Sequence, residues 1–290
     1  MTEMLPNPKA DRLRALLARG QLIQMPCCYD GLSARLIEQA GFELTFLSGF
    51  SASVSRIGAP DVGLMSYGEV LDQARNVLEA IDIPMMVDGD TGYGNPMNVE
   101  RTVEGFARAG CAGVMIEDQV APKRCGHTAG KAVVDREEAF DRVRAAVHAR
   151  GRTDILIKAR TDARRDHGLA EAIKRAQTFV ELGADLIFVE EPYSEAEMRA
   201  ICREVPGPVV ANMLEGGQTP ILPADRLAAL GFAIAAYPLT CLSAATHALR
   251  GVLTKLKSGE DYAGDMVPFA DLRRIVGFDG YYQAERRYSR

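Results

Sequence analysis

One short segment of this chain sets a cysteine among cations and glycines. Residues 121–131 are Ala-Pro-Lys-Arg-Cys-Gly-His-Thr-Ala-Gly-Lys, and their thiol is Cys125. The residues that flank it are Lys123, Arg124, Gly126 and His127. Neighbouring cations favour a thiolate, so we expect the pKa of Cys125 to fall toward neutral pH. A basic surface loop with an incidental cysteine would contain the same residues, so the interpretation depends on a second segment.

That second segment, residues 87–95, carries two carboxylates directly before a glycine-rich turn. Its sequence is Val-Asp-Gly-Asp-Thr-Gly-Tyr-Gly-Asn, and the acids are Asp88 and Asp90. Side chains two residues apart on a strand point to the same face, so both acids are predicted to face one site. Together the two segments indicate a metal site covered by a proton-transferring lid over residues 120–134, which we expect to be mobile without ligand.

Length and composition restrict the class of protein. The chain has 290 residues, 47% of them hydrophobic, which suits one α/β barrel. Its formal net charge of −5 argues against a nucleic-acid partner. No secretory signal is predicted, and no apolar run approaches the ~18 residues of a membrane span. Six cysteines without a CxxC pair favour a reduced, cytoplasmic protein.

Short apolar runs alternate with amphipathic stretches along the whole chain. Each run is almost continuously apolar, as expected for a parallel strand that is covered on both faces. The predicted strands are Leu22–Cys27, Leu44–Gly49, Met85–Asp90, Gly113–Asp118, Ile155–Arg160, Leu186–Glu190, Val209–Leu214 and Phe232–Pro238. The clearest predicted helices between them are Val99–Ala109, Arg136–Ala149, Leu169–Leu182 and Glu195–Glu204.

Eight strand–helix units predict a single (β/α)8 TIM-type barrel domain over residues 1–290. An open doubly wound sheet is the alternative, but its usual glycine fingerprint is missing after the first predicted strand. After the eighth strand, a long helix is predicted over Thr240–Ser258. The helical tail over residues 259–290 is expected to pack on a neighbouring subunit.

Polar residues fall where the predicted strands end, which is where a barrel builds its active site. They are Ser48, Gly49, Asp88, Asp90, Glu117, Asp118, Arg160, Glu190, Asn212 and Glu215. Converging carboxylates repel one another, and a divalent cation would relieve the repulsion; the oxygen donors favour Mg²⁺ or Mn²⁺ over Zn²⁺. The guanidinium of Arg160 suits a substrate carboxylate, and the turn at Ser48–Phe50 can offer backbone N–H groups to a second one.

Five motifs together resemble the phosphoenolpyruvate mutase/isocitrate lyase superfamily. They are Asp88-Gly-Asp-Thr-Gly-Tyr-Gly-Asn95, Ile116-Glu-Asp-Gln119, Lys123-Arg-Cys-Gly-His127, Ala159-Arg-Thr-Asp162 and Asn212-Met-Leu-Glu-Gly-Gly-Gln-Thr-Pro220. The resemblance extends from about Ala10 to the C-terminus. It implies a (β/α)8 barrel whose last helix is exchanged between subunits, in a homotetramer built from dimers.

The resemblance also implies roles for individual residues. Asp88 and Asp90 match the acids of an active-site Mg²⁺, and Asp61 and Glu117 match acids that hold its waters. The residues that match substrate contacts are Ser48, Gly49, Phe50, Gly126, Arg160, Glu190 and Asn212. Cys125 matches the acid/base carried by the lid, and its closure would place Lys123, Arg124 and His127 around developing negative charge.

The subgroup is indicated by a few positions. The Cys-containing lid and Pro238 resemble the lyases, whereas Ser243 and Phe269 stand where tricarboxylate lyases carry arginine. The segment from Asn212 resembles 2,3-dimethylmalate lyases and petal death proteins, and equally carboxyvinyl-carboxyphosphonate phosphonomutase. A third carboxylate would therefore lack a cation, which makes a dicarboxylate the expected substrate.

The sequence thus predicts a Mg²⁺-dependent carbon–carbon lyase that cleaves an alkyl-substituted malate to a 2-oxo acid and a carboxylate. Cys125 would protonate the departing carbanion, and Tyr29 or a metal-bound hydroxide would take the hydroxyl proton. Phosphonomutase or oxaloacetate decarboxylase or hydrolase chemistry is the alternative. A catalytically idle binding or structural protein is a further alternative, but such a protein would be expected to lose the acids or the thiol.

Overall fold

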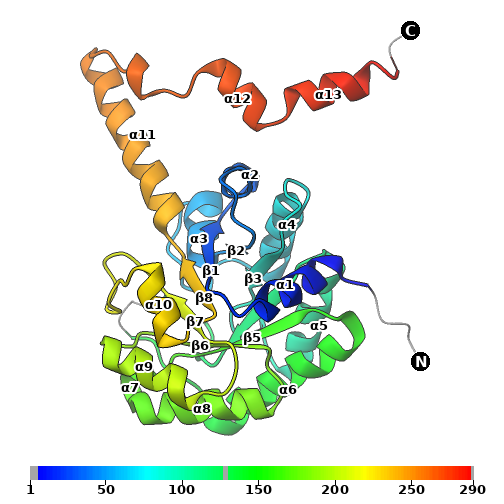
Figure 1. The fold of residues 1–290 in the computed structure, drawn as a ribbon, viewed down its shortest axis with the longest axis vertical. Helices are drawn as coiled ribbons and strands as arrows, with labels where there is room; N and C mark the ends of the chain where they lie inside the picture. The colour runs from blue at the N-terminus through cyan, green and yellow to red at the C-terminus, as the bar shows by residue number, and fades with distance from the viewer. Residues whose placement is uncertain (1–5, 127–129, 289–290) are drawn as a thin grey trace.

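The computed structural model describes residues 6–126 and 130–288, and within them eight parallel strands form a nearly closed barrel (Figure 1). Neighbouring strands follow in the order β6-β5-β4-β3-β2-β1-β8-β7, and one parallel bridge, between Ile187 and Val209, links β6 to β7. The strands are β1 (Ile23–Cys28), β2 (Thr45–Leu47), β3 (Met85–Asp88), β4 (Gly113–Glu117), β5 (Leu156–Thr161), β6 (Leu186–Val189), β7 (Val210–Asn212) and β8 (Ile234–Tyr237). The predicted TIM-like barrel is confirmed, and the open doubly wound sheet is wrong.

Helix α1 (Pro8–Ala18) precedes β1 and contributes Ala10, Leu13 and Leu16 to the core inside the barrel, whereas the other helices follow the strands on the outside (Figure 1). They are α2 (Gly31–Gln39), α3 (Gly49–Ile57), α4 (Tyr67–Leu78), α5 (Pro96–Arg108), α6 (Arg136–Thr153), α7 (Arg164–His167), α8 (Leu169–Glu181), α9 (Glu195–Glu204) and α10 (Ala224–Leu230). Several bounds have a local cause. α5 begins at Pro96 because the Asn95 side chain accepts hydrogen bonds from the N–H groups of Met97 and Asn98. None of the helices in the described residues is long and apolar enough to cross a membrane.

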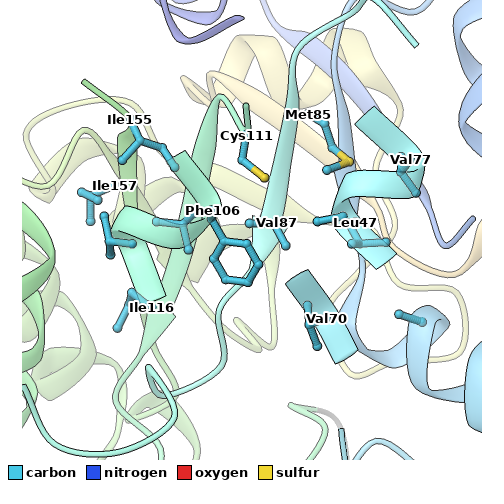
Figure 2. Packing of buried hydrophobic residues seen from close by; sticks show 14 of the residues in the cluster. Leu47, Val70, Val77, Met85, Val87, Phe106, Cys111, Ile116, Ile155 and Ile157 are labelled. Carbon is cyan, nitrogen blue, oxygen red and sulfur yellow. The ribbon is translucent and has the colours of Figure 1, made fainter. Parts of the chain in front are cut away.

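Alternate residues of each strand face different cores, and this alternation positions the site. On β3, Met85 and Val87 pack outward against helix residues such as Val70 and Phe106 (Figure 2). Met86 lies between them and belongs to the inner cluster that fills the barrel. Because the side-chain period of a strand is two, Asp88 must face the barrel interior as Met86 does, one layer nearer the strand end.

The C-terminal part of the chain projects away from the barrel. It comprises α11 (Thr240–Ser258), the short 3-10 helix η1 (Ala263–Asp265), α12 (Phe269–Ile275) and α13 (Phe278–Glu285), and none of them contains a buried residue (Figure 1). One contact to the barrel is a hydrogen bond of 3.0 Å that Gln39 Nε2 donates to the carbonyl of Ile275. The predicted helix Thr240–Ser258 is confirmed, while helix exchange and the packing of the tail on a neighbour stay predictions.

Candidate active site

A cavity opens at the carboxyl ends of the strands, and most of the residues predicted for the site line it. They are Ser48, Phe50, Asp61, Asp88, Glu117, Lys123, Arg124, Cys125, Gly126, Arg160, Glu190 and Asn212. Asp88, Glu117, Arg160 and Asn212 lie on four strands, and the others come from the segments after β2, β4 and β6. Strand ends of a parallel barrel meet at one edge, which is why residues more than 160 positions apart in the sequence share this cavity.

The acids at one side of the cavity surround the ammonium of Lys123. Its Nζ lies 2.7 Å from Asp61 Oδ2 and 2.9 Å from Asp90 Oδ1, and all three side chains are buried. The backbone N–H of Asp90 donates a 3.1 Å hydrogen bond to Asp88 Oδ1. Burial raises the pKa of Asp90 to about 6, with the negative charges of Asp88 and Asp61 adding to the effect and Lys123 opposing it. The sequence had placed Lys123 beside Cys125, but its ammonium lies with the acids.

Gly49 brings the start of α3 against Asp88. A Cβ atom at position 49 would lie 2.5 Å from Asp88 Oδ2, a distance that no side chain tolerates. α3 begins at Gly49, where we had predicted the strand to continue, because the Ser48 hydroxyl caps the helix by accepting the N–H of Ser51. The turn at Ser48–Phe50 therefore lies directly against Asp88.

The residues present fit a hard divalent cation held largely through water. Glu117 Oε1 is buried and has no hydrogen-bond partner among the described residues, and burial raises the pKa of this carboxyl well above its usual range. A cation beside Glu117 and Asp88 would compensate that charge. No three carboxylates, thiols or imidazoles among the described residues converge on a point that could hold a metal ion. One or two direct carboxylates with waters, the usual coordination of Mg²⁺, would agree with both observations.

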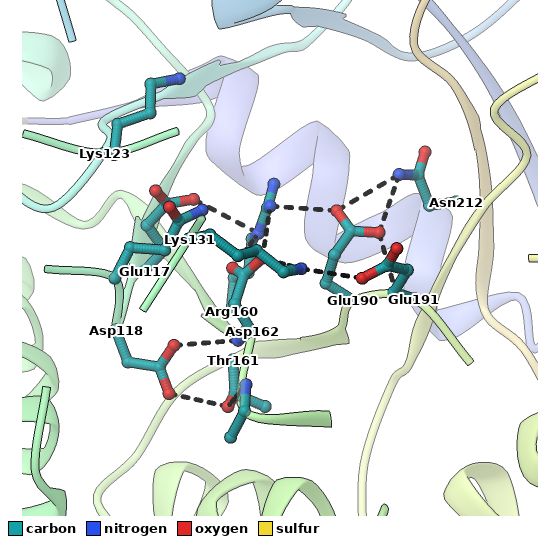
Figure 3. A network of polar contacts seen from close by, with 12 residues as sticks. Glu117, Asp118, Lys123, Lys131, Arg160, Thr161, Asp162, Glu190, Glu191 and Asn212 are labelled. Carbon is teal, nitrogen blue, oxygen red and sulfur yellow. Dashed lines mark hydrogen bonds and ion pairs between the residues drawn. The ribbon is translucent and has the colours of Figure 1, made fainter. Parts of the chain in front are cut away.

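Arg160 is the centre of the opposite side of the cavity (Figure 3). Its Nε lies 2.8 Å from Asp162 Oδ2 and 3.3 Å from Glu117 Oε2, and its Nη2 lies 3.1 Å from Glu190 Oε2. Asn212 Nδ2 donates a 3.1 Å hydrogen bond to Glu190 Oε1. Nη1 of Arg160 has no hydrogen bond or ion pair in the described part of the chain, so the fork keeps one nitrogen for a ligand.

A second set of buried groups holds Asp162, which in turn orients Arg160 (Figure 3). Lys131 Nζ lies 2.9 Å from Asp162 Oδ1, and the backbone N–H of Asp162 donates a 2.9 Å hydrogen bond to Asp118 Oδ1. Arg175 from α8 completes the set, with its Nη1 3.0 Å from Asp118 Oδ2. We had not predicted Lys131, Asp162 or Arg175 for the site, because their contacts join α8 and the lid to two strand ends.

The cysteine loop closes over Arg160. A Cβ atom at Gly126 would lie 2.3 Å from Arg160 Nη2 and 2.8 Å from Glu190 Oε2, so any larger residue here would have to displace both side chains. Cys125 is half-buried and lines the cavity, whereas Arg124 is exposed. The loop base is pinned by hydrogen bonds between Asp118–Val120 and Ala132–Val134. His127 lies outside the described residues, and mobility of the loop stays a prediction.

Tyr29 does not join this cavity. It lines a separate, mostly apolar groove between α2 and the start of α11, and the structure therefore does not bring its phenol to the acids or to Cys125. Burial raises the pKa of Tyr29 above its usual value. Ser243 and Phe269 do not line the strand-end cavity of their own chain either, and the Phe269 side chain is 75% exposed.

The floor of the cavity contains residues that lie outside the predicted site. Phe46, Phe188 and Lys158 line it, one layer below the polar strand ends. Burial lowers the pKa of Lys158 from its usual 10.5 to about 8. A signal was present in the sequence, since Lys158 precedes Arg160 by two residues on an apolar strand and must share its face.

Fold and cavity define an α/β barrel with an acidic, lid-covered site at its strand ends. The family model described as phosphoenolpyruvate phosphomutase matches residues 13–257. A 2,3-dimethylmalate lyase of Eubacterium barkeri is 39% identical over 97% of this chain and 98% of its own length. Carboxyvinyl-carboxyphosphonate phosphorylmutase of Arabidopsis thaliana, a chloroplastic protein, is 41% identical over 98% of this chain and 87% of its own length. The chain belongs to the phosphoenolpyruvate mutase/isocitrate lyase superfamily.

Solved structures agree over the whole fold. Oxaloacetate acetylhydrolase in complex with 3,3-difluorooxalacetate superposes with a TM-score of 0.93 at 34% identity, covering 98% of each chain. Phosphonopyruvate hydrolase in complex with oxalate and Mg²⁺ superposes with a TM-score of 0.86 at 30% identity, covering 97% of this chain and 99% of that one. The names of these relatives give different reactions, so the substrate of this protein has to be inferred from the residues of the cavity.

Proposed function

We propose that this protein is a Mg²⁺-dependent carbon–carbon lyase that cleaves an alkyl-substituted malate to a 2-oxo acid and a carboxylate. The observation that carries the proposal is the meeting of three parts in one cavity: the acids around Asp88, the guanidinium of Arg160 and the thiol of Cys125. The 39% identity to a 2,3-dimethylmalate lyase along almost the full length supports the same class of reaction.

Each part would supply one requirement of the cleavage. Asp88 and Asp90 would hold Mg²⁺ directly, with Asp61 and Glu117 holding its waters; Mn²⁺ would serve in its place. When bound, the cation would polarise the 2-hydroxycarboxylate end of the substrate and neutralise the surrounding acids. Arg160 would bind a substrate carboxylate through its remaining nitrogen, while Glu190 and Asn212 keep the guanidinium in place.

Bond cleavage needs a proton removed and a proton returned. Loss of the hydroxyl proton lets the C2–C3 bond break, so that C2 becomes the carbonyl carbon and the electron pair stays on C3. The C3 fragment departs as an enediolate-like carboxylate, and the thiol of Cys125 gives its proton to C3. Cys125 lines the same cavity and precedes Gly126, which lies against Arg160 and Glu190, and a closed loop would exclude water from the carbanion. The position of Tyr29 gives no support to it as the hydroxyl base.

Phosphonomutase or oxaloacetate hydrolase chemistry is the second candidate. Its support is the 41% identity to the Arabidopsis phosphorylmutase and the TM-score of 0.93 with oxaloacetate acetylhydrolase. The same acids and the same guanidinium would serve those substrates, so binding geometry alone does not separate the reactions.

A substrate panel separates them. We expect the Mg²⁺-loaded protein to release 2-oxo acid fastest from 2,3-dimethylmalate or a related alkylmalate, and to use methylisocitrate and oxaloacetate poorly. EDTA should abolish turnover, and Mg²⁺ or Mn²⁺ should restore it. A highest kcat/KM with methylisocitrate would contradict the substrate class, and full turnover of metal-free protein would contradict the metal. Phosphonate rearrangement or acetate release from oxaloacetate at the highest rate would favour the second candidate.

We further propose that the barrel is completed by a second copy of the chain, as helix exchange would require. α11 exposes an apolar stripe, Leu249, Leu253 and Leu256, and the apolar groove beside α2 lies at its base. The tail from residue 259 exposes further large apolar side chains, Met266, Val267, Phe269, Leu272, Val276, Phe278, Tyr281, Tyr282 and Tyr288. Such surface is rare on a monomer. Sedimentation equilibrium should show a tetramer built from dimers, and a monomer at micromolar concentration would refute the exchange.

The expected cellular setting is a reducing one. All six cysteines are free of disulfide bonds in the structure, as suits the proposed cytoplasmic location.

A further inference from the structure

Lys158 extends across the floor of the cavity. It comes from β5, yet its Nζ lies 3.8 Å from the ring centroid of Phe46 on β2 and 5.7 Å from that of Phe188 on β6. Two strands, β3 and β4, separate β5 from β2 in the barrel, so the side chain spans the interior. Only 2% of Lys158 is exposed, and that remainder lines the cavity. The ammonium therefore points into the site from below.

Lys158 differs from the other buried cations in having no acidic partner. Six lysine and arginine side chains are buried in the described part of the chain, and five of them have a carboxylate oxygen within 2.9 Å. These five are Lys123, Lys131, Arg142, Arg160 and Arg175. For Lys158, the described residues supply no hydrogen bond and no ion pair; its nearest partners are the two aromatic faces, and the charges of Asp88 and Glu190 act on it from farther away.

Burying the ammonium of Lys158 without a counter-ion costs hydration free energy, and filling the floor of the cavity does not need a charged residue. The neighbouring floor residues, Cys27, Met115, Val210 and Ala236, are apolar, so a methionine or leucine would pack there without losing hydration. Aromatic faces attract the ammonium but do not replace a counter-ion. A buried charge without a partner is expected where the partner arrives with the ligand.

The start of α3 lies on the metal side of the cavity, against Asp88. Phe46, which Lys158 approaches, precedes Ser48 by two residues on the strand that leads into this helix. The first N–H groups of a helix, here those of Gly49 and Phe50, have no partner within the helix. A carboxylate that accepts these N–H groups would therefore lie beside Asp88, which leaves Lys158 as the cation for a carboxylate farther from the metal site.

We propose that Lys158 binds the second carboxylate of the substrate, the one that neither Arg160 nor the start of α3 holds. Lys158 is thereby a substrate-binding residue that selects di-acids long enough to reach the floor. The inference rests on the proposed function only in taking the substrate to be a di-acid. It does not depend on which bond is cleaved.

Two unreactive di-acids test this assignment by calorimetric titration of the Mg²⁺-loaded protein. Oxalate is too short to reach the floor, whereas 2,3-dimethylsuccinate spans the cavity and lacks the hydroxyl group that cleavage needs. In Lys158→Met we expect the affinity for dimethylsuccinate to fall about 30-fold, the scale of one charged hydrogen bond. Oxalate affinity should change less than threefold. Met115→Leu, a change of the same floor without a charge, should alter the ratio of the two affinities less than threefold.

Three results would overturn the assignment. They are equal binding of dimethylsuccinate by Lys158→Met and wild type, an equal loss of both di-acids in the folded variant, and a wild-type protein that binds oxalate alone. Lys158→Gln is titrated in parallel and decides by the same criteria if the methionine variant does not fold. If no alkylmalate is cleaved, the proposed lyase fails while these titrations still test Lys158.

Discussion

Replacing Lys158 by methionine should make the ligand-free protein more stable. Burial lowers the pKa of Lys158 from 10.5 to about 8. A shift of this size means that burying the charged group lowers the free energy of unfolding by about 3 kcal/mol at neutral pH. Methionine is of similar length and packs without that cost. Loss of the contact to the Phe46 ring, worth up to about 2 kcal/mol when desolvated, opposes the gain. We expect a net gain of about 1–2 kcal/mol at pH 7.

The sign of the pH dependence follows from the direction of the shift. Between pH 8 and 10.5 the folded protein has released the Lys158 proton while the unfolded chain still holds it, so wild-type stability rises with pH from this group. Below pH 8 both states are protonated and the full cost is present. The advantage of Lys158→Met should therefore be largest at pH 7 and fall to zero or reverse by pH 10, while contributions from other groups cancel between the two proteins.

Urea unfolding measures both effects, with EDTA present and at one protein concentration, because association shifts apparent stability. Met115→Leu serves as the matched control for a change of packing at the same floor, and its difference from wild type should not vary with pH. A Lys158→Met protein that is less stable than wild type at pH 7 would refute the reasoning. So would a difference that stays constant from pH 7 to pH 10.

Two further variants test the lid and the metal side of the cavity. Cys125→Ser raises the pKa of the proton donor by several units, so kcat should fall at least ~10²-fold with little change in KM; near wild-type turnover would show that the thiol only packs the loop. Gly49→Ala puts a methyl group 2.5 Å from Asp88 Oδ2, so this acid must move. We expect Mg²⁺ affinity, followed by titration calorimetry, to fall at least ~10-fold, whereas Gly251→Ala, on the exposed part of α11 with no atom near its Cβ, should bind Mg²⁺ as wild type does.

Much of the fold was predictable because its signals are local. A parallel strand covered on both faces gives a continuous apolar run, and all eight runs were found with bounds within a few residues of the structure. The limits of this approach appear at Gly49, which we had placed at a strand end. There Ser48, the residue directly after β2, caps the start of α3, and the apolar content of the segment does not indicate that change from strand to helix.

The composition of the cavity was also largely predictable, since the carboxyl ends of parallel strands meet at one edge. Asp88, Glu117, Arg160, Glu190 and Asn212 were expected there for this reason, and they line one cavity. Their roles in catalysis remain predictions that the variants and titrations above address.

What the sequence by itself determined is the barrel, the edge that carries the site and the types of residue found there. Only the tertiary structure decided which groups pair. In the structure, Lys123 forms ion pairs with Asp61 and Asp90, and Tyr29 lines another groove. Lys158 faces the cavity and forms no ion pair with a described residue. The physical reason is the length of these side chains. Strand periodicity determines which face of the sheet a side chain points to. The partners of a long side chain that crosses the barrel depend on how all eight strands are arranged.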